Sequence, residues 1–308
     1  MKNIDRSSPP QSAVYGAPPT DLVEVPDGAV QLSPLRPGAQ ALEALPDACL
    51  DAITVAAPAG SVERSFVLAH ALRVLAPGGT VTATAAKDKG GLRLRRELEG
   101  FGCAVAERFK ARQRICTAHR PHTLVGVADA IAAGGPVWID EIGFYSQPGI
   151  FAWNRVDAGT AFLLKHLPPL AGRGVDLGAG LGILSRAVLA SPTVTALTLV
   201  ELDRRAVEAA KANVKDLRAR FSWSDAREAG FTDLDFVVSN PPFHAEGLED
   251  RTLGQAFIAS AGRMLRRSGS FHLVANRHMP YEDGLRAAFR SVKTLADEGG
   301  YKVIEARK

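Results

Sequence analysis

The fold of the second half of this 308-residue chain is decided by residues 175–184, which read VDLGAGLGIL. The apolar start predicts a strand, the three glycines predict a tight turn, and the residues from Ile183 to Ala190 predict a helix. Glycines allow a sharp turn, a close approach of the backbone to a nucleotide, and helix N-terminal amides directed at it. A glycine turn also closes ordinary strand-to-helix connections, so alone it is weak evidence for a nucleotide site.

The elements after this turn strengthen the case for a nucleotide site. The next predicted strand, Ala196 to Val200, ends at Glu201, where doubly wound folds place a carboxylate that binds ribose hydroxyls. A third strand leads to Asp225, which suits an adenine edge. The intervening helix is expected to begin at an N-cap, Asp203. Its predicted apolar stripe consists of Val207, Ala210, Val214 and Leu217.

A dinucleotide-binding dehydrogenase would share the strand, the turn and the acidic residue. Its fingerprint, however, is Gly-x-Gly-x-x-Gly, whereas this turn is Asp176-x-Gly178-x-Gly180-x-Gly182. A fourth predicted strand, residues 234–239, also leads to Asn240-Pro241-Pro242-Phe243, which has no place in that fingerprint. Both features argue against a nicotinamide cofactor.

Each member of the Asn-Pro-Pro-Phe motif has a role in methylating a planar amine. The lone pair of an exocyclic amine is conjugated with its ring, so the nitrogen attacks poorly until acceptors orient it. The Asn240 side-chain carbonyl and the Pro241 backbone carbonyl can accept the two amine hydrogens without a strong base. The two prolines remove N–H donors, and Phe243 offers a ring on which an extruded base can stack. The alternative is a turn at a strand end with a buried phenylalanine. It would account for any one of these residues, but it accounts poorly for all four together.

The strand–helix–strand order occurs twice. Residues 50–57, 62–75 and 80–85 predict a strand, a helix and a strand, as do residues 234–239, 256–266 and 271–275. The first copy has Ala56-Ala57-Pro58-Ala59 where the second has the Asn-Pro-Pro-Phe motif, so only the second keeps polar groups. Residues 8–46 predict loops and short extended pieces. The small-residue stretch 128–136 suggests a domain boundary, with domains 1–130 and 131–308.

Composition sets the class of protein. Apolar residues make up 46% and charged residues 23%, which is ordinary for a globular chain. No apolar run approaches the roughly 20 residues of a membrane span, and residues 1–11 lack the apolar segment of a signal peptide. The three cysteines lack zinc-binding spacing, so we expect no metal. We therefore expect a cytoplasmic protein.

The net charge is +4, yet residues 87–120 alone carry ten basic and four acidic residues, a net charge of +6. Such a segment can contact nucleic-acid phosphates, but charged helix surfaces are often only solvated. From charge alone, both interpretations stay open.

The second half resembles the ribosomal RNA small subunit methyltransferase C family. The matching stretches are residues 148–160 (PGIFAWNRVDAGT), the glycine turn, Asn240 to His244, residues 274–276 and residues 300–303. The resemblance implies a class I methyltransferase fold, Rossmann-like and doubly wound, using S-adenosylmethionine on a guanine amine in ribosomal RNA. It also implies a shorter, degenerate methyltransferase-like α/β domain before the catalytic one, which helps to hold RNA.

The resemblance implies further that Asp157 and Gly159 lie near the methionine end of the cofactor, with Phe151 toward the substrate; a helix cap and a core aromatic are the alternatives. The expected catalytic residues are Asn240, Pro241 and Phe243, and the substrate residues are Phe151, Pro242 and Phe243. The expected cofactor residues are Asp157, Gly159, Asp176, Gly178, Gly180, Gly182, Glu201, Asp225 and Asn240.

Two other functions stay open. Asn-Pro-Pro-aromatic sites also methylate adenine in DNA or RNA and glutamine in proteins, which keeps the chemistry and changes the amine. The chain could instead be a non-catalytic RNA-binding or ribosome-assembly protein, which the intact glycines, Glu201 and Asn240 argue against. The target nucleotide, the choice between free rRNA and an assembled subunit, and the oligomeric state do not follow from the sequence.

Overall fold

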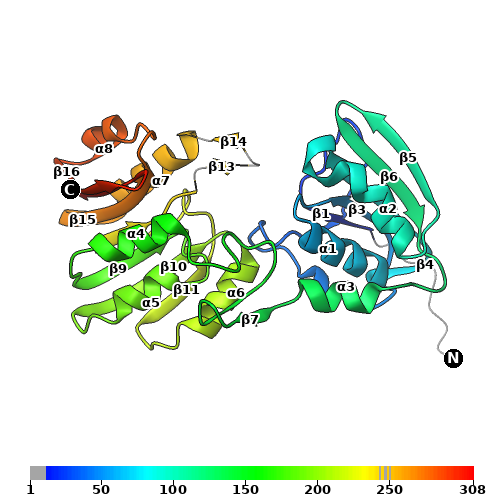
Figure 1. Ribbon diagram of the computed structural model, residues 1–308, viewed down its shortest axis with the longest axis horizontal. Coiled ribbons are helices and arrows are strands. Elements are labelled where there is room, and N and C mark those ends of the chain that lie inside the picture. The colour runs from blue at the N-terminus through cyan, green and yellow to red at the C-terminus, as the bar shows by residue number, and fades with distance from the viewer. Residues whose placement is uncertain (1–11, 243, 246–247, 250) are drawn as a thin grey trace. The chain divides into compact units, whose positions relative to one another are not determined.

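The computed structural model describes residues 12–242, 244–245, 248–249 and 251–308 (Figure 1). The chain forms two compact units. The first extends to Pro136 and includes Gln147–Gly149, and the second contains Val137–Ser146 and Ile150–Lys308. No helix among the described residues is long and apolar enough to cross a membrane.

The first unit is built on a six-stranded sheet in the order β2-β1-β3-β4-β6-β5. Its strands are β1 (Ser12–Tyr15), β2 (Val30–Gln31), β3 (Leu50–Ala56), β4 (Leu75–Ala86), β5 (Val105–Lys110) and β6 (Gln113–His119). The helices are α1 (Ser61–Val74), α2 (Leu92–Gly100) and α3 (Val127–Gly134), with short turns η1 (Leu42–Ala44) and η2 (Lys87–Gly91). Strands β1 to β4 are parallel, whereas β6 pairs antiparallel with both β4 and β5.

The second unit has a seven-stranded sheet in the order β11-β10-β9-β12-β15-β17-β16. The strands are β9 (Gly172–Leu177), β10 (Val194–Glu201), β11 (Ala219–Trp223), β12 (Leu234–Ser239), β15 (Leu265–Asn276), β16 (Ser291–Glu298) and β17 (Tyr301–Arg307). The helices are α4 (Ala158–His166), α5 (Ile183–Leu189), α6 (Arg204–Asn213), α7 (Arg251–Met264) and α8 (Glu282–Ala288). Two small hairpins, β7 (Val137–Ile139) with β8 (Phe144–Ser146) and β13 (His244–Ala245) with β14 (Leu248–Glu249), complete it.

Helices cover both faces of this second sheet. Side chains alternate along β12, so Phe236 and Val238 pack with Leu163 of α4 and Leu184 of α5, while Val237 packs on the opposite face. That opposite face holds residues from α7 and α8. The arrangement is the doubly wound α/β fold expected from the sequence, and it places the carboxyl ends of the parallel strands at one edge.

The two sheets share their pattern, which confirms the internal repeat. In each, parallel strands are followed by two antiparallel strands at one edge, and a helix connects the equivalent strands β3–β4 and β12–β15. The units differ before this helix. Between β1 and β3 the only helical segment is the short turn η1, whereas the helices α5 and α6 follow β9 and β10 in the second unit. The first unit therefore lacks the helix whose N-terminus follows a nucleotide-binding turn.

The segment after β3 is also occupied by a side chain of its own unit. Arg64, which is 1% exposed, donates from Nη1 to the carbonyls of Pro58 (3.0 Å) and Ala59 (2.8 Å). Its other nitrogens bind Glu97 of α2 at 2.7 Å. Pro58 and Ala59 follow β3 as the Asn-Pro-Pro-Phe motif follows β12. The carbonyls at this place in the first unit are thus already bonded.

One detail of the sequence interpretation was wrong. Helix α6 ends at Asn213, so Leu217 lies beyond it and is 94% exposed instead of extending the buried stripe. Val214 is the C-cap residue and Asp216, which follows, pairs with Arg218, so the chain turns away before Leu217. The small-residue stretch near residues 128–136 forms most of α3, which packs against α1.

Candidate active site

The site lies where two neighbouring parallel strands end. β9 leads into the glycine turn and β12 into Asn240, and their last residues, Leu177 and Ser239, are register partners. The Ser239 hydroxyl donates to the Leu177 carbonyl at 2.7 Å, which locks the two strand ends together. In the strand order, β10 lies on one side of β9 and β12 on the other, so this edge is the topological switch point where doubly wound folds bind ligands.

The glycine turn has a backbone that other residues rarely adopt. Gly178, Gly180 and Gly182 all have positive φ angles, of 74°, 52° and 81°. At Gly182 a Cβ atom would also lie 2.8 Å from Val214 Cγ2. Glycine is therefore required both for the turn and for the close packing of α5 against its neighbours.

A pocket brings several expected site residues together. It is lined by Phe151, Ala152, Arg155, Asp157, Thr160, Asp176, Gly178, Ala179, Gly180, Leu181, Ile183, Leu184 and Asn240. Phe151 is 68% exposed at its margin. Glycine 159 adjoins it, since a Cβ there would lie 3.4 Å from Asn240 Oδ1 and 3.3 Å from Tyr301. Arg155 and Thr160 were missed as site residues, although both lie in the stretch 148–160 that carries the family resemblance.

The Asn240 amide is held in one orientation. Its Nδ2 group donates to Asp157 Oδ2 at 2.7 Å and to Thr160 Oγ1 at 2.9 Å. Asp157 is the N-cap of α4, and the same Oδ2 atom accepts the Thr160 backbone N–H at 3.0 Å. Asp157 therefore caps α4 and orients the Asn240 amide with the same carboxylate oxygen. Its two predicted roles, as a helix cap and as a site residue, are compatible.

This orientation leaves the Asn240 carbonyl oxygen as an acceptor. Asn240 Oδ1 is buried and has no hydrogen-bond partner among the described residues. An unsatisfied buried acceptor costs free energy, so such an atom calls for an explanation. A bound amine donor would satisfy it, as the sequence motif predicts.

Asp176 presents a second unsatisfied oxygen in the same pocket. Its Oδ2 accepts the Ser185 hydroxyl at 2.6 Å, while Oδ1 has no partner within the described parts of the chain. Burial raises the pKa of the Asp176 carboxyl to about 7, against the lowering effect of the Ser185 hydrogen bond. A ligand cation would favour the carboxylate form. The pocket thus fits a ligand that carries a positive group, such as the ammonium of S-adenosylmethionine.

Glu201, at the end of β10, supports the glycine turn. Its Oε2 accepts the Gly180 N–H at 2.8 Å, and its Oε1 accepts the N–H groups of Leu202 (2.7 Å) and Asp203 (2.9 Å). Burial raises the pKa of this carboxyl, and the backbone hydrogen bonds oppose the shift. Carboxylate oxygens have about four acceptor positions, so Glu201 keeps capacity for a ribose hydroxyl.

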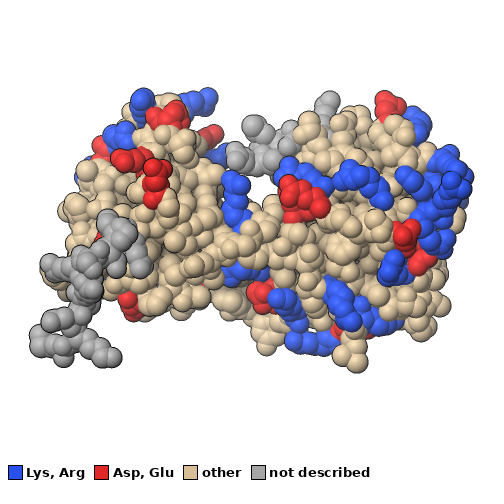
Figure 2. Space-filling view, turned by 180° about the vertical axis from the view of Figure 1, so that it is seen from behind, with Lys and Arg blue, Asp and Glu red and all other residues tan. Residues whose placement is uncertain are grey.

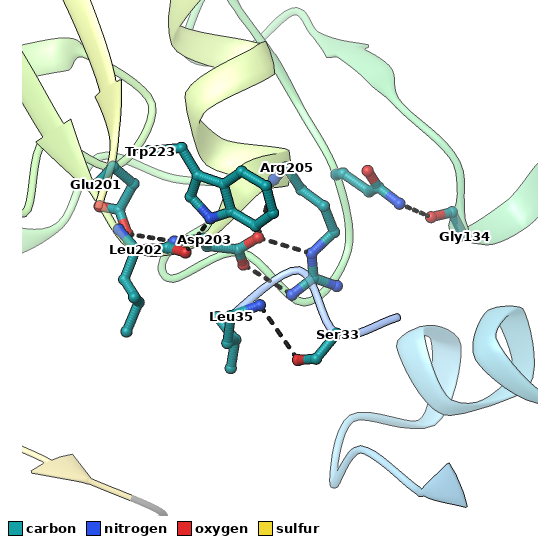
Figure 3. Close-up of polar contacts among 9 residues, drawn as sticks. Ser33, Leu35, Gly134, Glu201, Leu202, Asp203, Arg205 and Trp223 are labelled. Atoms are coloured by element: carbon teal, nitrogen blue, oxygen red, sulfur yellow. Dashed lines mark hydrogen bonds and ion pairs between the residues drawn. The ribbon is translucent and has the colours of Figure 1, made fainter. Parts of the chain in front are cut away.

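Trp223 lies beside Glu201 and was missed by the sequence argument. The two are register partners on β11 and β10, and the indole N–H donates to the Leu202 carbonyl at 2.8 Å (Figure 3). The helix behind them begins at Asp203, which accepts the Arg205 N–H as the expected N-cap. An aromatic ring fixed next to the Glu201 carboxylate offers a surface on which a nucleotide base could stack.

Asp225, Pro241 and Pro242 are not among the residues that line the pocket. Asp225 pairs with Arg227 beyond β11, and this hydrogen bonding lowers the pKa of its carboxyl. Pro241 is buried and Pro242 is exposed. Phe243 is outside the described residues. The adenine role of Asp225 and the substrate roles of Pro242 and Phe243 stay predictions.

Known proteins share this chain's sequence and fold. Residues 141–305 match the family described as methyltransferase small domain. Ribosomal RNA small subunit methyltransferase C of Shewanella amazonensis is 30% identical over 274 residues, covering 85% of this chain and 79% of that protein. The protein of the same name from Shewanella loihica is 29% identical over 271 residues, covering 84% and 77%.

A solved structure shows the same fold. It is the T. thermophilus 16S rRNA N2 G1207 methyltransferase in complex with AdoMet and guanosine, with a TM-score of 0.76 and 24% identity. The match covers 99% of this chain and 90% of that one. The likeness therefore includes both units, and not only the unit that contains the pocket.

Proposed function

Because the chain belongs to the ribosomal RNA small subunit methyltransferase C family, we propose that it transfers a methyl group to the exocyclic amine of a guanine in small-subunit ribosomal RNA. S-adenosylmethionine, the cofactor of this methyltransferase, supplies an electrophilic methyl group on sulfonium sulfur. An rRNA substrate would place the protein in the cytoplasm.

The observation that carries the proposal is the buried, unpartnered Asn240 Oδ1. One amine hydrogen of the guanine donates to this oxygen and the other to the Pro241 carbonyl. Both hydrogens are then directed away from the methyl group, and the nitrogen lone pair is directed toward it. Bound S-adenosylmethionine would supply the methyl group and keep the C–S bonding electrons as a thioether, and the methylated nitrogen would lose its extra proton to water. Orientation of reacting groups can supply roughly 7–11 kcal/mol of the barrier reduction.

The cofactor roles follow from the position of each group. We assign Asp176 to the ammonium group, Glu201 to the ribose hydroxyls, and the amides of the glycine turn to the adjoining polar atoms. Asp157 and Gly159 act beside Asn240, where Asp157 fixes the amide and Gly159 leaves room for the reacting groups.

We propose that the first unit, which contains the predicted domain 1–130, is a degenerate methyltransferase domain that helps to hold RNA. Ala57 is the first residue after β3, as Asn240 is the first after β12, and it has no acceptor side chain. Arg64 donates to the carbonyls of Pro58 and Ala59. A second reaction centre is therefore not expected there.

The test is transfer of label from S-adenosylmethionine to 30S particles and to rRNA that lack their native modifications, followed by nucleoside analysis. The expected product is N2-methylguanosine, and the control is the Asn240→Ala variant, in which transfer of label should be strongly slowed. Label found in adenosine or in a protein glutamine would show that the methylated amine is not that of guanine. Cofactor binding without transfer to any of these substrates would instead support the non-catalytic function.

Replacing Glu201 with glutamine should weaken S-adenosylmethionine binding on the order of 10- to 100-fold, because a buried charged acceptor for ribose hydroxyls is lost. Titration calorimetry measures the Kd. Glu208→Gln is the matched control, because Glu208 is exposed on α6 and its carboxylate pairs with Lys211 of the same helix. Equal affinities of the two variants would remove the ribose role of Glu201.

A further inference from the structure

The β5–β6 hairpin ends in a strained two-residue turn. Ala111 and Arg112 join the strands, and both have positive φ angles, of 47° and 61°. A left-handed pair suits the twist of a tight hairpin but is unusual for residues other than glycine or asparagine. The turn is tied to the rest of the sheet, because the Lys87 N–H donates to the Arg112 carbonyl at 2.9 Å.

Sheet topology places this turn at the ligand-binding edge of the first unit. β4 ends at Ala86, which pairs with Gln113, the first residue of β6. Because β4 runs parallel to β3, the hairpin turn lies at the end where these strands terminate. In α/β sheets this is the edge that binds ligands. The Arg64 contacts with Pro58 and Ala59 lie after β3, at this same edge.

Nine of the ten basic residues of segment 87–120, all except Lys89, divide into two groups. Several are used within the unit: Arg95 pairs with Glu99, Arg108 donates to the Leu22 carbonyl, Arg114 pairs with Glu107, and Arg120 donates to the Leu72 carbonyl. Five others have side chains with no hydrogen bond or ion pair to any described residue: Lys87, Arg93, Arg96, Lys110 and Arg112.

All five of these cations are exposed. Lys110 and Arg112 flank the hairpin turn, Lys87 is bonded to it, and α2, which carries Arg93 and Arg96, begins directly after η2. Lys and Arg side chains occur over both units (Figure 2), so the density of charge alone does not identify a binding surface. Three unpaired cations, Lys87, Lys110 and Arg112, are instead grouped at one turn, and this grouping marks a candidate binding surface.

An exposed aromatic residue, Phe109, immediately precedes Lys110 at the end of β5. Phe109 is 54% exposed, and the guanidinium of its cross-strand partner Arg114 lies over the ring, 5.0 Å from its centroid. Glu107, at 3.4 Å, holds Arg114 in place. Phe109 adds nothing to the buried core of the unit. An open aromatic ring beside free cations is the combination that binds unpaired nucleotides, with bases stacked on the ring and phosphates near the cations.

We propose that the β5–β6 hairpin binds a single-stranded segment of the RNA substrate. Phe109 stacks on an unpaired base, and Lys87, Lys110 and Arg112 contact the adjoining phosphates. This inference rests on the proposed function for the class of substrate. The first unit is expected to help hold RNA, and the hairpin would be the part of that unit that contacts it.

The test uses the full chain and fluorescently labelled oligoribonucleotides, single-stranded and duplex, of one sequence. Phe109→Ala should weaken single-strand binding by about 5- to 150-fold, the range expected for one stacked base, without changing the salt dependence. Lys110→Gln with Arg112→Gln should weaken binding to both RNAs and lower the slope of log affinity against log salt by about 1.4 for the single strand.

The matched control is Lys215→Gln with Lys293→Gln, which removes the same charge from exposed positions in the second unit. Melting curves check that all variants are folded, and calorimetry checks that each binds S-adenosylmethionine like the parent chain. Control variants that lose as much affinity as the hairpin variants would overturn the proposal. So would a Phe109→Ala variant that binds single strands normally, as expected if the hairpin contacts a protein.

The proposal and the proposed function can fail separately. If the parent chain methylates rRNA while the hairpin variants bind RNA normally, the hairpin assignment is wrong and the activity stands. If the parent chain binds single strands through the hairpin but transfers no methyl group, the activity is wrong and the hairpin assignment stands.

Discussion

Replacing Asn240 with alanine is expected to lower the rate of methyl transfer by about 10²- to 10³-fold, the usual loss when one preorganised polar contact to the reacting group is removed. Asn240 Oδ1 is the acceptor that orients the amine, and alanine offers none. Cofactor affinity should change little, because Asp176 and Glu201 remain. Single-turnover kinetics measure the rate, and calorimetry measures the affinity. A variant with normal turnover would contradict the mechanism.

Thr160 provides an independent check of the same orientation. Thr160→Val keeps the shape but removes the Oγ1 atom that accepts from Asn240 Nδ2, whereas Thr160→Ser keeps the hydroxyl. We expect about tenfold slower turnover for valine, corresponding to one lost hydrogen bond, with rescue by serine. The KM for RNA should stay near its original value, because Thr160 acts on the orientation of Asn240. Equal rates for valine and serine would show that the amide needs no such support.

Replacing Arg64 with alanine is expected to destabilise the first unit by about 3–5 kcal/mol, because breaking a buried ion pair leaves an uncompensated charge. Glu97 would lose its partner, and the carbonyls of Pro58 and Ala59 would lose their donor. The absence of a side chain at Gly90 leaves room for the same guanidinium, since a Cβ there would lie 2.1 Å from Arg64 Nη1. Urea unfolding measured by circular dichroism gives the change in stability.

The chain offers a matched control and a built-in reporter for this experiment. Arg95→Ala removes an exposed ion pair with Glu99 on the same helix as Glu97 and should change the stability little, because solvent screens such pairs. All three tryptophans, Trp138, Trp153 and Trp223, belong to the second unit, so their fluorescence reports its unfolding. Similar losses for the two variants would contradict the structural role of Arg64.

The sequence predicted the local elements of the catalytic unit well, because those signals are local. The glycine turn at residues 178–182, the carboxylate of Glu201 at a strand end and the Asp203 cap each depend on neighbouring residues. The error at Leu217 has the same origin: a helical period cannot show where the chain leaves the helix. Trp223 was missed because its partner, Leu202, is distant in sequence and adjacent only through the pairing of β10 and β11.

Residue type and spacing alone predict the doubly wound fold, the repeat and an acceptor role for Asn240 and Pro241. Only the tertiary structure decided that Asp157 and Thr160, some 80 residues earlier in the chain, fix the Asn240 amide and leave its oxygen free. It also decided which cations of segment 87–120 are used internally. The physical reason is common to both: whether a polar group is satisfied depends on partners that folding brings to it, and these partners are remote in the sequence.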